Sequence, residues 1–213
     1  MLIDGHFTVY DSAKKQNVRD MTIARILGLR AKIDAQVGWH KTISNVDING
    51  VVGIEDPRSW GLSDRNSEAN FLNNNDINTL IRDGGFQAWG NRTTSSDPLF
   101  SFENYTRTGD IIIKTIESQM KWAIDKPMSI GLMSDICAAV QNKLDQWTRD
   151  GKLFGAKVWV EAADNTTDEV KNSKFVIRRE YTPVPPLEHL HTIQTITDRY
   201  IADFVSGVVS LVV

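Results

Sequence analysis

The most informative stretch of the chain reads Leu80-Ile81-Arg82-Asp83-Gly84-Gly85-Phe86-Gln87-Ala88-Trp89-Gly90-Asn91-Arg92-Thr93. Residues 77–82 have the β-branched and apolar side chains of a strand, and the Asp-Gly-Gly at 83–85 is typical of a tight turn. Residues 86–90 supply a return strand. The sequence therefore predicts a β-hairpin at the middle of the chain, followed by a polar loop.

Downstream of this hairpin the apolar residues recur at steps of three and four, as in helices. Residues 110–124 predict one amphipathic helix, and a second helix is expected from Ser129 or Ser134 to Gly151. Three strands are expected after it, over residues 156–162, 173–181 and 191–197.

Upstream, a strand is expected over residues 6–10 and a helix from Asp20 to Val37. A short strand is expected over residues 46–53. The polar segment over residues 55–64, which contains a proline and glycine, is the best position for a domain boundary. The pattern as a whole predicts an α+β protein.

Composition narrows the classes of protein further. The chain has 213 residues, of which 41% are hydrophobic and 24% charged, and its net charge of −3 gives no basic surplus for binding nucleic acid. A single cysteine, Cys137, excludes an internal disulfide framework and a site of paired zinc-binding cysteines. No run of 18 apolar residues is present, so no membrane span is expected.

The sequence contains no pattern typical of an active site. The nucleophile elbow, the zinc-protease motif, the P-loop and the dinucleotide fingerprint are all absent. His189 and His191 share one face of an expected strand and suggest a weak metal site, but a solvated strand edge explains the pair without a third ligand. Asp4, His6 and a serine can be written as a triad, but triads are recognised by geometry. We expect no catalytic, metal-binding or cofactor-binding residues.

The hairpin and the loop after it resemble the C-terminal domain of contractile tail sheath proteins of myophages and R-type pyocins. In that family, a hairpin ending in W-G-N-R-T or W-G-A-R-T follows an asparagine-rich segment like residues 70–75. Residues 106–112 and 121–125 resemble the start and end of a family helix, and residues 38–45 and 48–53 resemble the end of its middle domain. The positions that carry the motif, with structural roles, are Trp89, Gly90, Asn91, Arg92, Thr93, Arg107 and Asp110.

The resemblance implies an α+β fold, with a mixed β-sheet and flanking helices, preceded by the end of an α/β middle domain. Residues 1–62 would be the incomplete end of the middle domain, residues 63–203 the C-terminal domain, and residues 204–213 a terminal strand or arm. The middle domain of the family carries a subtilisin-like label, which describes a sequence family and implies no chemistry.

The same resemblance implies a structural subunit that forms hexameric rings around a tail tube and contracts to drive the tube into the host envelope. It implies a mechanism without a cofactor, and because the chain has no nucleophile motif we expect it not to be an enzyme. The implied partners are neighbouring sheath subunits, the tail tube protein, the baseplate and the tail terminator, without nucleic acid or membrane insertion. The implied location is the tail of a virion or phage-tail-like particle, assembled in the cytoplasm of the bacterial host. The alternatives are a serine hydrolase and a generic phage or host binding module.

Two surfaces are expected to contact other subunits. Lys114, Lys121 and Lys126 flank the helix over residues 110–124 and would face the tube or a neighbouring subunit, although a solvated helix face explains them equally well. The last ten residues are uncharged, and we expect them to form a strand donated to a neighbour's sheet. Packing on their own domain and fraying are the alternatives. The residues concerned are Phe204, Val205, Val208, Val209, Leu211, Val212 and Val213.

Overall fold

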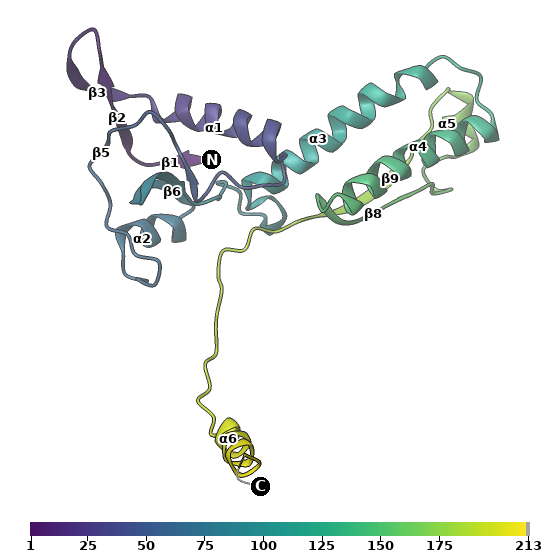
Figure 1. Ribbon diagram of the computed structural model, residues 1–213. Helices are drawn as coiled ribbons and strands as arrows, with labels where there is room; N and C mark the ends of the chain where they lie inside the picture. The colour runs from purple at the N-terminus through teal and green to yellow at the C-terminus, as the bar shows by residue number, and fades with distance from the viewer. Residues whose placement is uncertain (212–213) are drawn as a thin grey trace.

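The predicted hairpin lies in the first of two bodies of the chain (Figure 1). In the computed structural model, which describes residues 1–211, β6 (Ile77–Asp83) and β7 (Gly85–Trp89) pair antiparallel around Gly84, whose φ is +67°. β1 (Leu2–Ile3) pairs parallel with β6, and β4 (Val46–Asp47) pairs antiparallel with β7. The sheet order is β1-β6-β7-β4, and the hairpin prediction is confirmed.

A second sheet and two helices complete the first body. β2 (His6–Asp11) lies between β3 (Gln16–Asp20) and β5 (Gly53–Glu55), with both neighbours antiparallel. The predicted N-terminal helix is present as α1 (Thr22–Gln36), and α2 (Glu68–Asn74) precedes the hairpin. The core of this body is built mainly by α1 and the two sheets, with no residue from α2, and consists of Phe7, Ile26, Leu29, Ile33, Ile43, Ile48, Leu80 and Ala88.

The expected boundary between residues 62 and 63 falls inside this body. β1 and β4 come before that position, β6 and β7 come after it, and all four belong to one sheet. Residues on both sides therefore share hydrogen bonds and a hydrophobic core.

The second body is an elongated pair of helices with a small sheet (Figure 1). After a short turn, η1 (Pro98–Phe100), α3 (Glu103–Met120) runs to a second turn, η2 (Lys121–Ala123), and α4 (Ile130–Arg149) returns. β8 (Leu153–Trp159) and β9 (Arg178–Pro183) pair antiparallel, with α5 (Thr167–Lys171) between them in sequence. Their core comprises Ile112, Ile116, Val140, Leu144, Trp147 and Leu153.

The ends of these helices follow local chemistry. The Ser129 hydroxyl accepts a hydrogen bond from the Leu132 amide at the start of α4, as one of the two predicted caps requires. Gly151 has φ of +72° just beyond the end of the helix. By contrast, α3 begins at Glu103, seven residues before the predicted Asp110. Apolar periodicity missed these first turns because the residues buried there are the polar Asn104 and Thr108.

The C-terminal region departs from the sequence predictions. Residues 191–197, an expected strand, are extended but pair with no strand within residues 1–211. The strand expected over residues 204–213 is wrong for the described part, since α6 (Arg199–Val209) is a helix there. Val212 and Val213 lie outside the described residues. The physical reason is that Ile201, Phe204, Val205 and Val208 have the i, i+3, i+4, i+7 spacing of an amphipathic helix.

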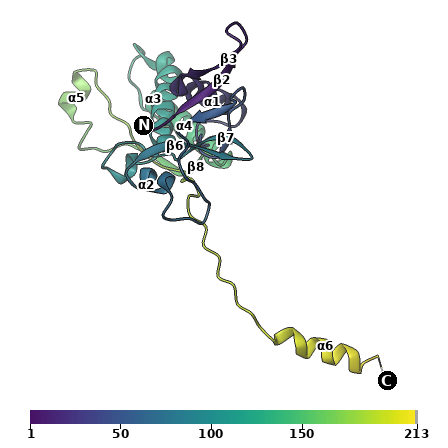
Figure 2. The ribbon, with the colours of Figure 1, turned by 90° about the vertical axis from the view of Figure 1, so that its left-hand side faces the viewer.

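The chain leaves the second body after β9 and ends far from it. We call residues 184–188 the tail root and residues 189–211 the tail. Figure 2 shows α6 at the far end of an extended trace, and every residue of the tail is exposed. None of the helices in the described range is both long and apolar enough to cross a membrane.

Candidate functional site

Asn104, in the first turn of α3, joins three distant segments. Its buried side-chain Nδ2 donates hydrogen bonds to the carbonyl oxygens of His40 (3.1 Å) and Val184 (3.0 Å). Its Oδ1 accepts a hydrogen bond of 2.8 Å from Asn91 Nδ2. One side chain therefore holds together the loop after α1, the turn after the hairpin and the tail root.

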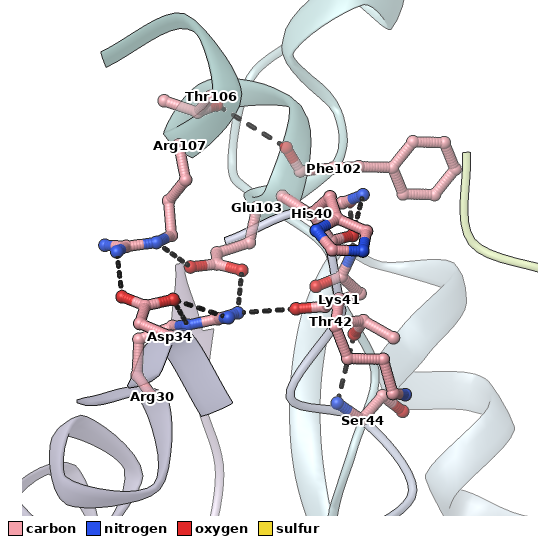
Figure 3. A network of polar contacts seen from close by, with 12 residues as sticks. Arg30, Asp34, His40, Lys41, Thr42, Ser44, Phe102, Glu103, Thr106 and Arg107 are labelled. Atoms are coloured by element: carbon pink, nitrogen blue, oxygen red, sulfur yellow. Dashed lines mark hydrogen bonds and ion pairs between the residues drawn. The ribbon is translucent and has the colours of Figure 1, made fainter. Parts of the chain in front are cut away.

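Four charged side chains from α1 and α3 surround the same place, and we call them the ion cluster: Arg30, Asp34, Glu103 and Arg107 (Figure 3). Arg30 pairs with Asp34 Oδ1 at 2.8 Å and with Glu103 Oε2 at 3.2 Å. Arg107 pairs with Asp34 and lies 3.6 Å from Glu103 Oε1. Arg30 also donates to the carbonyl oxygen of Lys41 at 2.8 Å.

Burial dominates the electrostatics of this cluster. The Arg30 side chain is only 7% exposed and that of Glu103 only 15%. Desolvation raises the pKa of Glu103 above its usual value, although the charges of Arg30 and Arg107 oppose the shift. Such a cluster fixes the relative geometry of α1 and α3, because removing one member leaves another buried charge without its partner.

We call the region around Asn104 and the ion cluster the junction, and the W-G-N-R-T turn (residues 89–93) is also part of it. Gly90 has φ of +115°, and a Cβ there would overlap the side-chain amides of both Asn73 and Asn78, so no side chain fits. Trp89 packs edge-on against Trp60 with a ring separation of 5.2 Å. The Thr93 hydroxyl donates to the Phe100 carbonyl oxygen, which joins the turn to η1.

Arg92 attaches the tail root to this turn. Its Nη2 lies 2.6 Å from Glu188 Oε2, and its guanidinium stacks 4.6 Å from the centre of the Phe102 ring. Because Asn104 holds Val184 and Arg92 holds Glu188, both ends of the tail root are fixed on the junction. The tail therefore leaves the molecule in a defined direction.

The other predicted residues lie away from this junction. Asp110 is exposed on α3, and Lys114, Lys121 and Lys126 are exposed near the far end of that helix. Lys126 Nζ lies 4.5 Å from the centre of the Trp122 ring. Their contact with a tube or another subunit stays a prediction.

The alternative catalytic and metal-binding residues do not form a site. The Asp4 carboxylate accepts a hydrogen bond of 2.7 Å from Arg58 Nε, so the acid of the suggested triad is already paired with an arginine. His189 and His191 are both exposed in the tail. No group of three His, Cys, Asp or Glu side chains suitable for a metal ion occurs among residues 1–211.

Sequence analysis identified Asn91, Arg92 and Arg107 through the family resemblance, but it missed Arg30, Asp34, Glu103 and Asn104. The signal that was available is the position of Arg30 on the apolar stripe of the first helix, between Ile26 and Ile33. An arginine on the buried face of a helix requires a buried acidic partner.

Two family models match adjoining parts of the chain. Residues 1–94 match the phage tail sheath protein central domain, and residues 95–197 match the phage tail sheath C-terminal domain. The chain is 43% identical over 208 residues to the tail sheath protein of Escherichia phage P2, covering 98% of this chain and 52% of that protein. It is 42% identical over 200 residues to the major tail sheath protein of Serratia phage KSP20, covering 94% and 51%. The chain thus spans about half the length of these curated relatives.

Solved structures share the fold at lower identity. The helical sheath of the anti-feeding prophage in its contracted state matches with a TM-score of 0.76 and 23% identity, over 92% of this chain and 55% of that chain. The contracted sheath complex of PVC, an extracellular contractile injection system, matches with a TM-score of 0.76 and 18% identity, over 91% and 55%. These matches confirm the expected α+β fold. With both family models covering residues 1–197 and relatives at 42–43% identity, the chain belongs to the phage tail sheath protein family.

Proposed function

We propose that this chain is the self-assembling part of a contractile tail sheath subunit. Copies of the subunit form hexameric rings around a tail tube, and contraction of the sheath drives the tube into the host envelope. The observation that carries this proposal is the tail, which is exposed along its whole described length, presents large apolar side chains to solvent and is held at its root. Family membership supports the same assignment.

The tail has the properties of a segment that is ordered by a partner. Leu190, Ile193 and Ile196 are 76%, 95% and 93% exposed, and the segment around them is extended. Such side chains gain free energy only when another surface covers them. We therefore propose that the donated strand comprises residues 189–197, upstream of the residues 204–213 that the sequence suggested.

The β8–β9 sheet is the acceptor that we propose for this strand. It has two strands within residues 1–211. On the outer edge of β8, Gln141 already forms hydrogen bonds with the Val158 amide and the Ala156 carbonyl oxygen, whereas the outer edge of β9 pairs with no strand in the described range. A donated strand adds main-chain hydrogen bonds at such an edge and places alternate side chains against the receiving body. The tail of one copy would thereby link it to the next copy.

The remaining partners follow from the family. We propose contacts with neighbouring sheath subunits, the tail tube protein, the baseplate and the tail terminator, and no contact with nucleic acid or insertion into a membrane. Lys114, Lys121 and Lys126 are proposed to face the tube or a neighbouring subunit. The location is the tail of a virion or phage-tail-like particle, assembled in the host cytoplasm, and the subunit has no catalytic activity and no cofactor.

Electron microscopy and sedimentation velocity test this proposal directly. The intact subunit should form rings or sheath-like tubes. Deletion of residues 187–213 should leave a protein that is still folded by circular dichroism but does not assemble. Normal assembly of the 187–213 deletion would contradict strand donation. Stoichiometric labelling of one serine by an active-serine probe would instead favour the hydrolase alternative.

A further inference from the structure

An apolar groove lies at the far end of the second body. It has a volume of about 480 Å³ and runs between the start of α4 and the segments that follow β8. Ile130 on its rim is 92% exposed. The groove is lined by Met128, Ser129, Ile130, Met133, Ser134, Cys137, Val160, Val170 and Phe175. No charged side chain lines it, so it is suited to an apolar ligand.

α6 presents a surface that matches this groove in chemistry. Ile201, Phe204, Val205 and Val208 form one stripe and are 63%, 70%, 53% and 43% exposed. The opposite face carries Arg199, Asp203, Ser206 and Ser210. An isolated helix of 11 residues is marginal in water, so α6 needs a surface to pack on.

The groove and the β8–β9 sheet are continuous. Val160 directly follows the last residue of β8, and Phe175 precedes the first residue of β9 by three positions. A strand placed beside this sheet and parallel to β8 therefore ends at the groove. Residues 189–197 span about 30 Å when extended, against about 23 Å for the seven residues of β8, and only Asp198 separates them from α6.

We infer that α6 of one copy docks, by its apolar stripe, in the groove of a second copy that has received residues 189–197 of the same tail. This inference rests on the strand donation proposed above and adds a second attachment point beyond it. The mode is that of an amphipathic helix in a hydrophobic groove.

The tail root argues for a second copy over the chain's own groove. To pair with its own β9, the tail would have to turn back directly after Pro183. Instead, Asn104 holds Val184 and Arg92 holds Glu188 against the junction, and Figure 2 shows the tail directed away from the body. A second copy therefore meets the tail without breaking these contacts.

Peptide binding separates this inference from strand donation. The receiver is the chain ended at residue 188, whose core is complete, since no buried residue lies beyond Leu153 in the described range. The probes are two fluorescein-labelled peptides, residues 187–198 and residues 187–211, followed by fluorescence anisotropy. We expect the longer peptide to bind at least about tenfold more tightly, because burying four apolar side chains adds to the strand contacts.

Matched substitutions locate the gain in affinity. Met133→Asp in the groove should abolish the tenfold difference, whereas Ala138→Asp on an exposed position of α4 outside the groove should keep it. Phe204→Asp in the long peptide should abolish it too, whereas Ser206→Asp should not. The peptide pair leaves the receiver unchanged, so its result does not depend on receiver stability.

Each outcome has a defined meaning. If the two peptides bind equally, or if Met133→Asp retains the difference, groove docking is overturned while strand donation stands. If neither peptide binds, both are contradicted.

A disulfide cross-linking experiment tests whether the α6 helix in the groove comes from a second copy. A chain carrying Val205→Cys and Cys137→Ser is mixed with a chain that keeps Cys137, which lines the groove, and the mixture is oxidised. A disulfide between the two chains supports docking between copies, and Ser206→Cys in place of Val205→Cys should give at least about fivefold less product. A disulfide that forms only within a single chain carrying Val205→Cys and Cys137 would overturn the assignment to a second copy.

Discussion

The junction and the tail are opposite in chemistry and in surroundings. The junction buries charged and amide side chains, among them Arg30 and Glu103, which pair with each other, and Asn104, which pairs with Asn91. The tail exposes apolar side chains that nothing in residues 1–211 covers. Polar groups at the junction fix one geometry within the chain, because each has few acceptable partners. Apolar groups in the tail favour association between chains, since burial there requires another surface.

The largest effect should follow from breaking the ion cluster. Arg30→Ala should lower the free energy of unfolding by about 3–5 kcal/mol, because it leaves Glu103 buried beside fewer cations. Ile193→Ala in the tail should change it by less than about 0.5 kcal/mol. Urea denaturation measures both values. Arg19→Ala, which breaks a surface pair with Glu55, is the control for a charge lost at the surface and should cost at most about 1 kcal/mol. Equal losses for Arg30→Ala and Arg19→Ala would contradict the assignment of a buried cluster.

A single methyl group at Gly90 should test the rigidity of the junction. Gly90→Ala should cost about 2–3 kcal/mol, because its φ is positive and the new Cβ overlaps the side-chain amides of Asn73 and Asn78. Gly28→Ala is the matched control, since this helical glycine has no atom within 4 Å of the added Cβ. It should stabilise the protein by about 0.5–1 kcal/mol. Thermal melts that shift in the same direction for both variants would rule out the steric argument.

Charge exchange at the tail root should affect assembly more than stability. Arg92→Glu should raise the concentration needed for assembly about tenfold, because repulsion from Glu188 frees the tail root. The double variant Arg92→Glu, Glu188→Arg should recover much of the loss. Sedimentation velocity across a concentration series gives the comparison. Assembly by the single variant at the wild-type concentration would show that the direction of the tail is unimportant.

The smallest effect concerns pH. The raised pKa of Glu103 means that the folded state binds its proton more tightly than the unfolded state does. Protonation of Glu103 therefore adds stability as pH falls through its raised pKa, and this contribution is lost as pH rises. Glu103→Gln should lose stability more steeply on acidification below neutral pH than the wild type. Melting temperatures at half-unit steps of pH would show the difference, and parallel curves would contradict the shift.

The sequence predicted elements whose apolar periodicity is unambiguous. The hairpin at residues 77–90, the first helix and the body of α4 follow directly from spacing and turn residues. The start of α3 was missed because polar residues are buried there. The C-terminal helix was assigned as a strand because a short, uncharged run rich in apolar residues is compatible with both periodicities.

The ion cluster lies beyond such reasoning for a different physical cause. Arg30 and Glu103 are 73 positions apart, and only the packing of α1 against α3 brings them together. The resemblance singled out Arg107 without its partner Asp34, because a motif marks single positions and not the contacts between them.

The direction of the tail also sets how many neighbours a copy can bind. Under the proposed exchange, each copy gives one tail and receives one tail, so its donor and acceptor are different surfaces. Such a head-to-tail contact does not limit the number of copies that can join. A linear row of copies always keeps one free tail at one end and one empty acceptor sheet at the other. Only closure into a ring, or a separate capping protein at the last copy, satisfies every tail. A tail that folded back onto its own sheet would instead satisfy itself and give a monomer.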